Sequence, residues 1–115
     1  MMAGILSAAI GVSTGIRAES PGHYPELSKL YYDFEVAGYC GLVTNRVGRG
    51  FQRRNAELIA AHELDREAVN KLRGDAWQAA HKEWQNRGLG GFRNWCRTEG
   101  RAAAEQLGEM ADPAP

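Results

Sequence analysis

The sequence predicts an all-α fold: a small antiparallel helical bundle of three helices, or of four if the first helix is broken, stapled by one disulfide. Apolar residues recur at helical spacing along most of the chain, and no useful stretch alternates as a strand does. The 115 residues suffice for one domain with one core. We therefore expect a single helical domain over residues 19–112 and a frayed tail at 113–115.

The first 18 residues resemble an export signal. Residues 1–16 carry no charge and include an apolar run of small residues, and Ile16 and Ala18 fit a signal-peptidase pattern that places cleavage after Ala18. Because no Lys or Arg precedes the apolar run, the segment is either a cleaved signal peptide or an uncleaved hydrophobic anchor in contact with a membrane surface. A buried N-terminal helix of a cytosolic protein is the remaining interpretation.

The first long helix begins at Pro25 and Glu26, since Pro fits the first turn and an acid favours the positive end of the helix dipole. Its apolar residues fall within one arc of a helical wheel: Val36, Cys40, Val43, Val47, Phe51 and Leu58. The sequence leaves two alternatives open, one long helix kinked near Gly48 or two helices joined at residues 48–50.

A turn is expected at residues 62–65, with Asp65 as the N-cap of the next helix and Leu64 packing on Val69. That helix should end at Gly88. Its predicted inner face consists of Val69, Leu72, Ala76, Ala80 and Trp84, with Trp77 at the edge. The last helix should turn inward Phe92, Trp95, Cys96, Ala103, Leu107 and Met110.

Cys40 and Cys96 are the only cysteines, and each lies at the centre of its helix's apolar arc. No C-x-x-C or nearby histidine gives them zinc-site or thioredoxin-like spacing. In an exported protein two such residues predict one disulfide between the first and last long helices. The alternative is a pair of buried free thiols.

The sequence gives little support for catalysis, so we expect no enzymatic activity and no cofactor. It contains no G-x-S-x-G motif, and the glycines at 88–91 follow no strand, so a dinucleotide-binding fingerprint lacks its context. His62, Glu83 and Glu99 are weak candidates for a metal site in the bundle, because they lie on or near inner arcs. The alternative is that Glu83 and Glu99 pair with Arg54 or another arginine.

Two groups of arginines form the most distinctive polar pattern. The first has i, i+3, i+7 spacing and one further member, and the second has i, i+4, i+8 spacing; the residues are Arg46, Arg49, Arg53, Arg54, Arg93, Arg97 and Arg101. Such stripes are candidates for binding an anion or an acidic partner, or are ordinary solvated helix faces. Fourteen basic residues balance fourteen acidic ones, which argues against nucleic acid as a partner.

Aromatic residues are concentrated in the first helix, and Tyr31, Tyr32 and Tyr39 are the candidates for an aromatic contact surface. Adjacent Tyr31 and Tyr32 should not both face one core.

We therefore expect an exported, non-enzymatic helical protein that acts by contact with another envelope or secreted protein, as an accessory subunit or an inhibitor- or immunity-type partner. The alternatives are an anion-binding module that uses the arginine stripes on lipid headgroups or polyanions, and a metal-binding bundle.

Overall fold

The computed structural model describes residues 24–88 and 90–112. Over these residues the chain is helical, as predicted, with no strand. The helices are α1 (Pro25–Tyr39), α2 (Asn45–His62), α3 (Arg66–Asn86), and a final run formed by α4 (Phe92–Trp95), the π-helical segment η3 (Cys96–Gly100) and α5 (Arg101–Glu109). The expected export segment at 1–18 and the expected tail at 113–115 lie outside the described residues.

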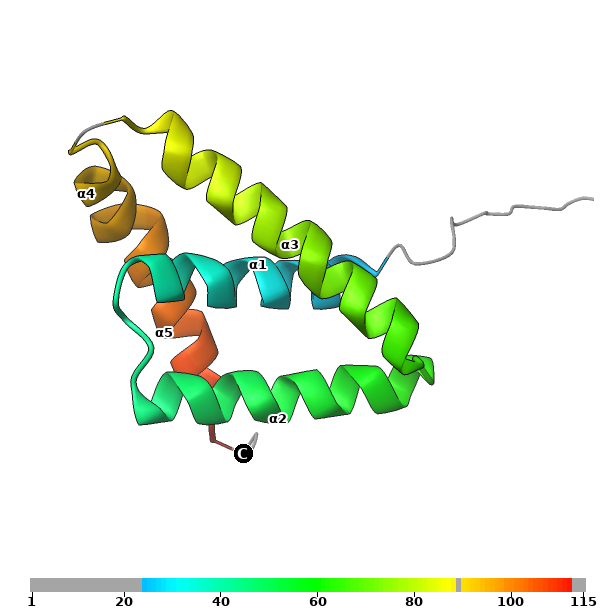
Figure 1. The fold of residues 1–115 in the computed structure, drawn as a ribbon. Coiled ribbons are helices and arrows are strands. Elements are labelled where there is room, and N and C mark those ends of the chain that lie inside the picture. Colours follow the sequence, from blue (N-terminus) through cyan, green and yellow to red (C-terminus); the bar gives the residue numbers. More distant parts are fainter. Residues whose placement is uncertain (1–23, 89, 113–115) are drawn as a thin grey trace, which may run out of the picture.

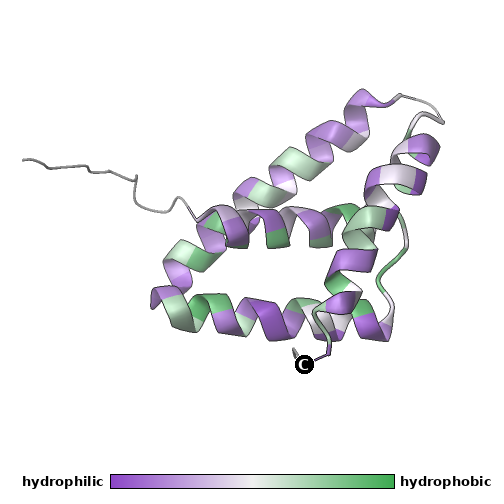
Figure 2. Cartoon of the chain, turned by 180° about the vertical axis from the view of Figure 1, so that it is seen from behind, coloured by the Kyte–Doolittle hydropathy of each residue, from purple (hydrophilic) through white to green (hydrophobic). Residues whose placement is uncertain are grey.

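α1 is the central helix of the bundle. It packs against α2, α3, η3 and α5, and α2 also packs against α5 (Figure 1). α1 and α2 run antiparallel, and α3 returns across α1 from the turn that follows α2 (Figure 1). Figure 2 shows both hydrophobic and hydrophilic residues along the helices, and the buried side chains of α1, α2, α3 and α5 are apolar.

The core has two parts. The larger cluster is centred on α1, α2 and the start of α3, and its buried residues include Leu27, Phe51, Leu72 and Leu107. The smaller cluster lies at the disulfide end of the bundle and consists of Val36, Ala80, Trp95 and Ala103.

The first long helix breaks at a different place from the one predicted. α1 ends at Tyr39, and Gly41 adopts a left-handed conformation with φ of 69°. Thr44 then caps α2 by accepting a hydrogen bond from the Val47 amide. Val43 is 44% exposed in this connection rather than on the inner arc. The expected break near Gly48 is therefore wrong.

Gly50 instead permits a close helix contact. A Cβ atom at this position would lie 1.7 Å from the Leu107 carbonyl oxygen. Since no side chain fits at that distance, glycine is what allows α2 and α5 to approach so closely.

The next two helix ends agree with the expectations. Glu63 adopts a left-handed conformation after α2, and Asp65 accepts a hydrogen bond of 2.9 Å from the Ala68 amide at the start of α3. α3 ends just before Gly88, whose φ is 68°.

The last helix differs from a regular α-helix at η3. A π-helical turn holds one extra residue and rotates the following side chains by ~100°. In an unbroken α-helix, Glu99 would follow Trp95 into the interior. In η3 the buried position falls to Gly100, and Glu99 is exposed.

Candidate interaction surface

The two cysteines form the predicted disulfide. Cys40 follows α1, Cys96 begins η3, and their Cα atoms are 5.3 Å apart. Gly100 lies against this bond, because a Cβ atom there would come within 2.8 Å of Cys40 Sγ. The described residues contain no free cysteine.

Tyr31 does not belong to a surface, which corrects the expectation for this residue. Its side chain is 1% exposed, and its hydroxyl donates a hydrogen bond of 2.5 Å to Asn55 Oδ1. Burial raises its pKa. Tyr32 is partly buried beside both core clusters. Adjacent tyrosines can both be packed because α1 has neighbours on more than one side.

Tyr39 joins a surface cluster that the sequence did not predict. We call it the aromatic ladder, and its members are Tyr39 of α1 and Trp77, His81 and Trp84 of α3. Trp77 stacks on His81 with ring centroids 4.9 Å apart, and Trp84 stacks on Tyr39 at 5.4 Å. A hydrogen bond of 2.6 Å joins the Tyr39 hydroxyl and His81 Nδ1. The four rings therefore form one contiguous cluster.

Much of the ladder is accessible to a partner. Trp77 is 48% exposed and Trp84 is 39% exposed. Trp84 was expected on the inner face of α3, but α1 ends at Tyr39, so Trp84 meets this ring instead of a core. Phe92, also expected inside, is likewise exposed and lines a hollow of about 420 Å³ with Trp84. The signal that could have indicated the α3 part of the ladder is the spacing of Trp77, His81 and Trp84, which places the three rings on one side of a helix.

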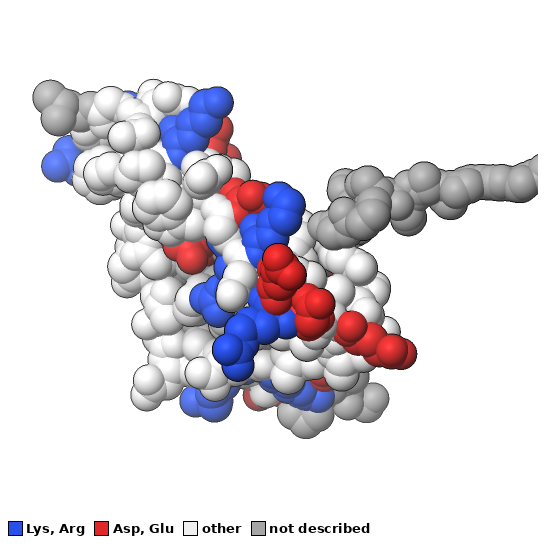
Figure 3. Space-filling view, turned by 45° about the vertical axis from the view of Figure 1, so that its right-hand side comes forward, with Lys and Arg blue, Asp and Glu red and all other residues white. Residues whose placement is uncertain are grey.

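Most arginines of the first stripe are paired with acids, both on α2 and from other parts of the chain. Arg46 pairs with Asp112 at 2.8 Å, and Arg54 pairs with Glu26 at 2.8 Å. Arg53 and Arg54 also face Glu57. Among the described residues Arg49 has no ion pair. On the face seen in Figure 3, basic side chains lie beside acidic ones rather than in one basic surface.

The second stripe is divided by η3. The guanidinium of Arg93 lies over the Phe92 ring, and Arg97 is exposed. The π-helical turn rotates Arg101 away from their line, so a stripe that assumes a regular α-helix is not formed.

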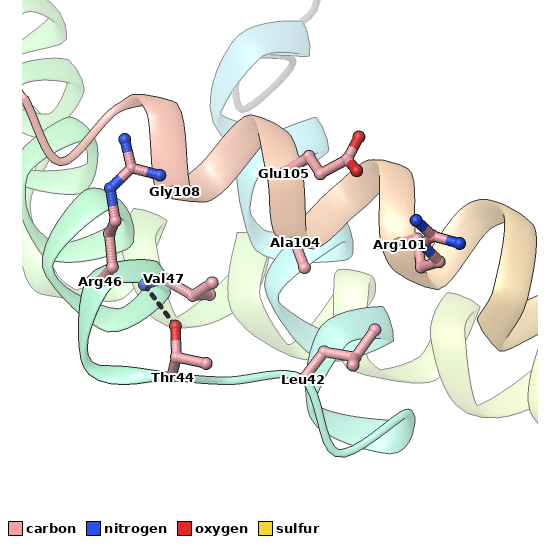
Figure 4. Close-up of a pocket in the computed structure, with 8 residues that line it drawn as sticks. All are labelled: Leu42, Thr44, Arg46, Val47, Arg101, Ala104, Glu105 and Gly108. Atoms are coloured by element: carbon pink, nitrogen blue, oxygen red, sulfur yellow. Dashed lines mark hydrogen bonds between the residues drawn. The ribbon is translucent and has the colours of Figure 1, made fainter.

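Arg101 instead lines a pocket with Arg46. The pocket has a volume of about 290 Å³ and lies between the start of α2 and α5. Figure 4 shows Arg46 and Arg101 at its two ends, Glu105 on its rim, and the side chains of Leu42, Val47 and Ala104 between them. One arginine from each predicted stripe thus reaches the same apolar hollow.

The weak metal candidates are not brought together. The His62 ring packs on Tyr24 at the end of α2. Glu83 and Glu99 both face the guanidinium of Arg87, at 2.5 and 3.9 Å. They therefore pair with an arginine, the alternative that the sequence left open, although the partner is Arg87 rather than Arg54. The described part of the chain holds no group of three or more His, Cys, Asp or Glu residues able to bind a metal ion.

Comparison with protein-family profiles, curated proteins and solved structures gives no match to this chain. Among the described residues, no helix is long and apolar enough to cross a bilayer.

Proposed function

We propose that the chain is an exported, non-enzymatic helical protein that binds another envelope or secreted protein through the aromatic ladder. The observation that carries the proposal is the cluster of Tyr39, Trp77, His81 and Trp84, with two large indole rings open to solvent. Tryptophan and tyrosine dominate the binding energy of many protein interfaces. Rings already held by stacking lose little conformational entropy on binding, which favours affinity.

Export is supported by two independent features. The Cys40–Cys96 disulfide is of the kind that persists in oxidising compartments, and residues 1–18 have the composition of a signal segment or anchor. The partner is accordingly a periplasmic or secreted protein, with this chain as its accessory subunit or its inhibitor- or immunity-type ligand. The intact mass of protein recovered from its native host checks both features, through cleavage after Ala18 and the two-dalton loss of disulfide formation.

The ladder is tested by affinity capture from an envelope extract. Trp77→Ala and Trp84→Ala should each abolish a stoichiometric complex, because each removes an exposed ring from the stack. Val43→Ala is the matched control, since Val43 is also an exposed apolar residue but lies in the α1–α2 connection. Circular dichroism should show equal helicity in all variants. The absence of a stoichiometric partner, or equal capture by the tryptophan variants and Val43→Ala, contradicts the proposal.

Anion binding is a second candidate function, favoured by the pocket between Arg46 and Arg101. The N-terminus of α2 adds a positive helix dipole beside these side chains. Binding to anionic lipid vesicles or polyphosphate should weaken steeply with salt and fall in Arg46→Gln and Arg101→Gln, while Arg66→Gln serves as a control. Binding that ignores salt and these substitutions removes the candidate.

A further inference from the structure

A hollow beside the ladder combines a carboxylate with two aromatic rings. Glu35, Gly38 and Tyr39 from the end of α1 and Trp77 from α3 line a volume of about 290 Å³. We call it the acidic notch. Gly38 is exposed and a Cβ atom there would meet nothing within 4 Å, so the notch is open to solvent at this residue.

Glu35 is unusual among the acids of α1. Glu26 pairs with Arg54, and Asp33 pairs with Lys29. Glu35 has neither an ion pair nor a side-chain hydrogen bond to any described residue, although it is partly buried. Its neighbours one turn away, Tyr31 and Tyr39, carry no positive charge. The Glu35 carboxylate therefore has no direct partner among the described residues. The guanidinium of Arg73, from α3, lies over the Tyr31 ring one turn away.

The surroundings of Glu35 suit a cation better than an anion or a neutral group. Burial of Tyr39 is the larger cause that raises its pKa, and the negative charge of Glu35 is the second. The two groups therefore interact electrostatically. The faces of tryptophan and tyrosine rings attract ammonium and guanidinium groups through the ring quadrupole. The lining residues include no Lys or Arg, so nothing in the notch opposes a cation.

We infer that the acidic notch receives the ammonium or guanidinium group of a lysine or arginine side chain on the protein bound by the aromatic ladder. The inference rests on the proposed function and specifies the chemistry of the partner. The charge of Glu35 compensates that of the incoming side chain, and Trp77 covers it from one side while belonging to both the notch and the ladder. Charge complementarity of this kind selects partners and register.

The notch can be tested without the partner. The probes are Nα-acetyl-lysine methylamide, Nα-acetyl-arginine methylamide and the uncharged Nα-acetyl-norleucine methylamide. Each is added to the isotope-labelled oxidised chain. The Trp77 indole N–H signal, assigned with Trp77→Phe, should shift saturably with the two cationic probes and not with the neutral one. Choline is a fourth probe, and saturable binding of choline alone would overturn the assignment to a protein side chain.

Glu35→Gln should weaken binding of the cationic probes by about fivefold to tenfold, because it removes the charge and keeps the shape. Glu109→Gln is the control, since Glu109 is exposed at the end of α5, without an ion pair among the described residues. Equal binding by wild type and Glu35→Gln, or an equal response to the neutral probe, overturns the inference.

Capture of the partner separates the inference from the proposed function. If Trp84→Ala abolishes the complex and Glu35→Gln weakens it, both stand. If Trp84→Ala abolishes the complex and Glu35→Gln leaves it unchanged, the ladder binds a partner but the inference fails. If no partner is captured, the proposed function fails and the inference that depends on it fails too.

Discussion

Two glycines of α2 should respond oppositely to the same substitution. Gly50 and Gly48 are two residues apart in one helix, so alanine should raise the helix propensity at both by up to ~1 kcal/mol. A Cβ atom at Gly48 meets nothing within 4 Å, whereas one at Gly50 would lie 1.7 Å from the Leu107 carbonyl oxygen. Ordinary contact begins at 3.4 Å, so α2 and α5 would have to separate by roughly 1.7 Å.

That separation would loosen the packing of Val47, Phe51 and Leu107, which are all buried in the larger core cluster. Overpacking of this kind costs about 1–3 kcal/mol, and a clash with backbone lies at the upper end because no side chain can rotate away. We therefore expect Gly50→Ala to lower the free energy of unfolding by about 2 kcal/mol after the propensity gain. Gly48→Ala should raise it by about 0.5–1 kcal/mol.

Urea unfolding of the oxidised proteins, followed by circular dichroism, measures both changes. Equal m-values would show that the substitutions alter stability rather than the surface exposed on unfolding. A stabilised Gly50→Ala, or two variants that shift in the same direction, would refute the close α2–α5 contact.

Three other predictions concern the disulfide, the buried tyrosine and a helix cap. Replacing Cys40 and Cys96 together by Ala should lower the unfolding free energy by roughly 4 kcal/mol, because the bond closes a long loop. Urea unfolding measures the loss, and a much smaller loss would contradict this prediction. The pKa of Tyr31 is raised from 10.0, so its contribution to stability is complete below that pH and lost as the pH rises through the folded pKa. The urea midpoint should therefore fall above about pH 10, and less steeply in Tyr31→Phe. Asp65→Ala should lower the free energy of unfolding by about 1 kcal/mol, because it removes the α3 cap. Asp75→Ala breaks only an exposed pair with Lys71 and should lower it less. Thermal melting of the two variants compares the losses.

The helix ends that could be predicted are those determined by neighbouring residues. Asp65 caps α3 with its own side chain, and Gly88 supplies the left-handed conformation after it. The break after α1 was misplaced because the apolar spacing continues across residues 40–44, while Gly48 and Gly50 resemble helix breakers. The role of Gly50 depends on a helix more than fifty residues away, so local spacing could not reveal it.

The π-helical turn explains why the predicted inner face of the last helix is wrong at Glu99. A wheel drawn at 100° per residue places Glu99 inside, and one extra residue moves Gly100 there instead. That extra residue also separates Arg101 from Arg93 and Arg97. A regular pattern cannot predict such a turn, which places Gly100 against Cys40, a residue distant in the chain.

The surface was only partly predictable for a similar reason. The disulfide followed from the two apolar arcs, and Tyr39 was recognised as a contact candidate. The sequence does not distinguish the burial of Tyr31 from that of its neighbours, because this burial depends on the central position of α1 in the bundle. Helical spacing predicts Trp84 in the core, because aromatic residues at that spacing usually pack there. In the structure α1 ends at Tyr39, so Trp84 stacks on the Tyr39 ring and stays partly exposed.

The Cys40–Cys96 bond makes a closed covalent ring of the chain between these residues, and the ring contains all of α2 and α3. A protease that cuts the turn at residues 63–65 would open this ring without releasing a fragment. The nicked molecule would keep its mass on a non-reducing gel, apart from the water added by hydrolysis, and would separate into two pieces only after reduction. A single cut in this turn would therefore leave both parts of the chain joined as long as the disulfide is intact.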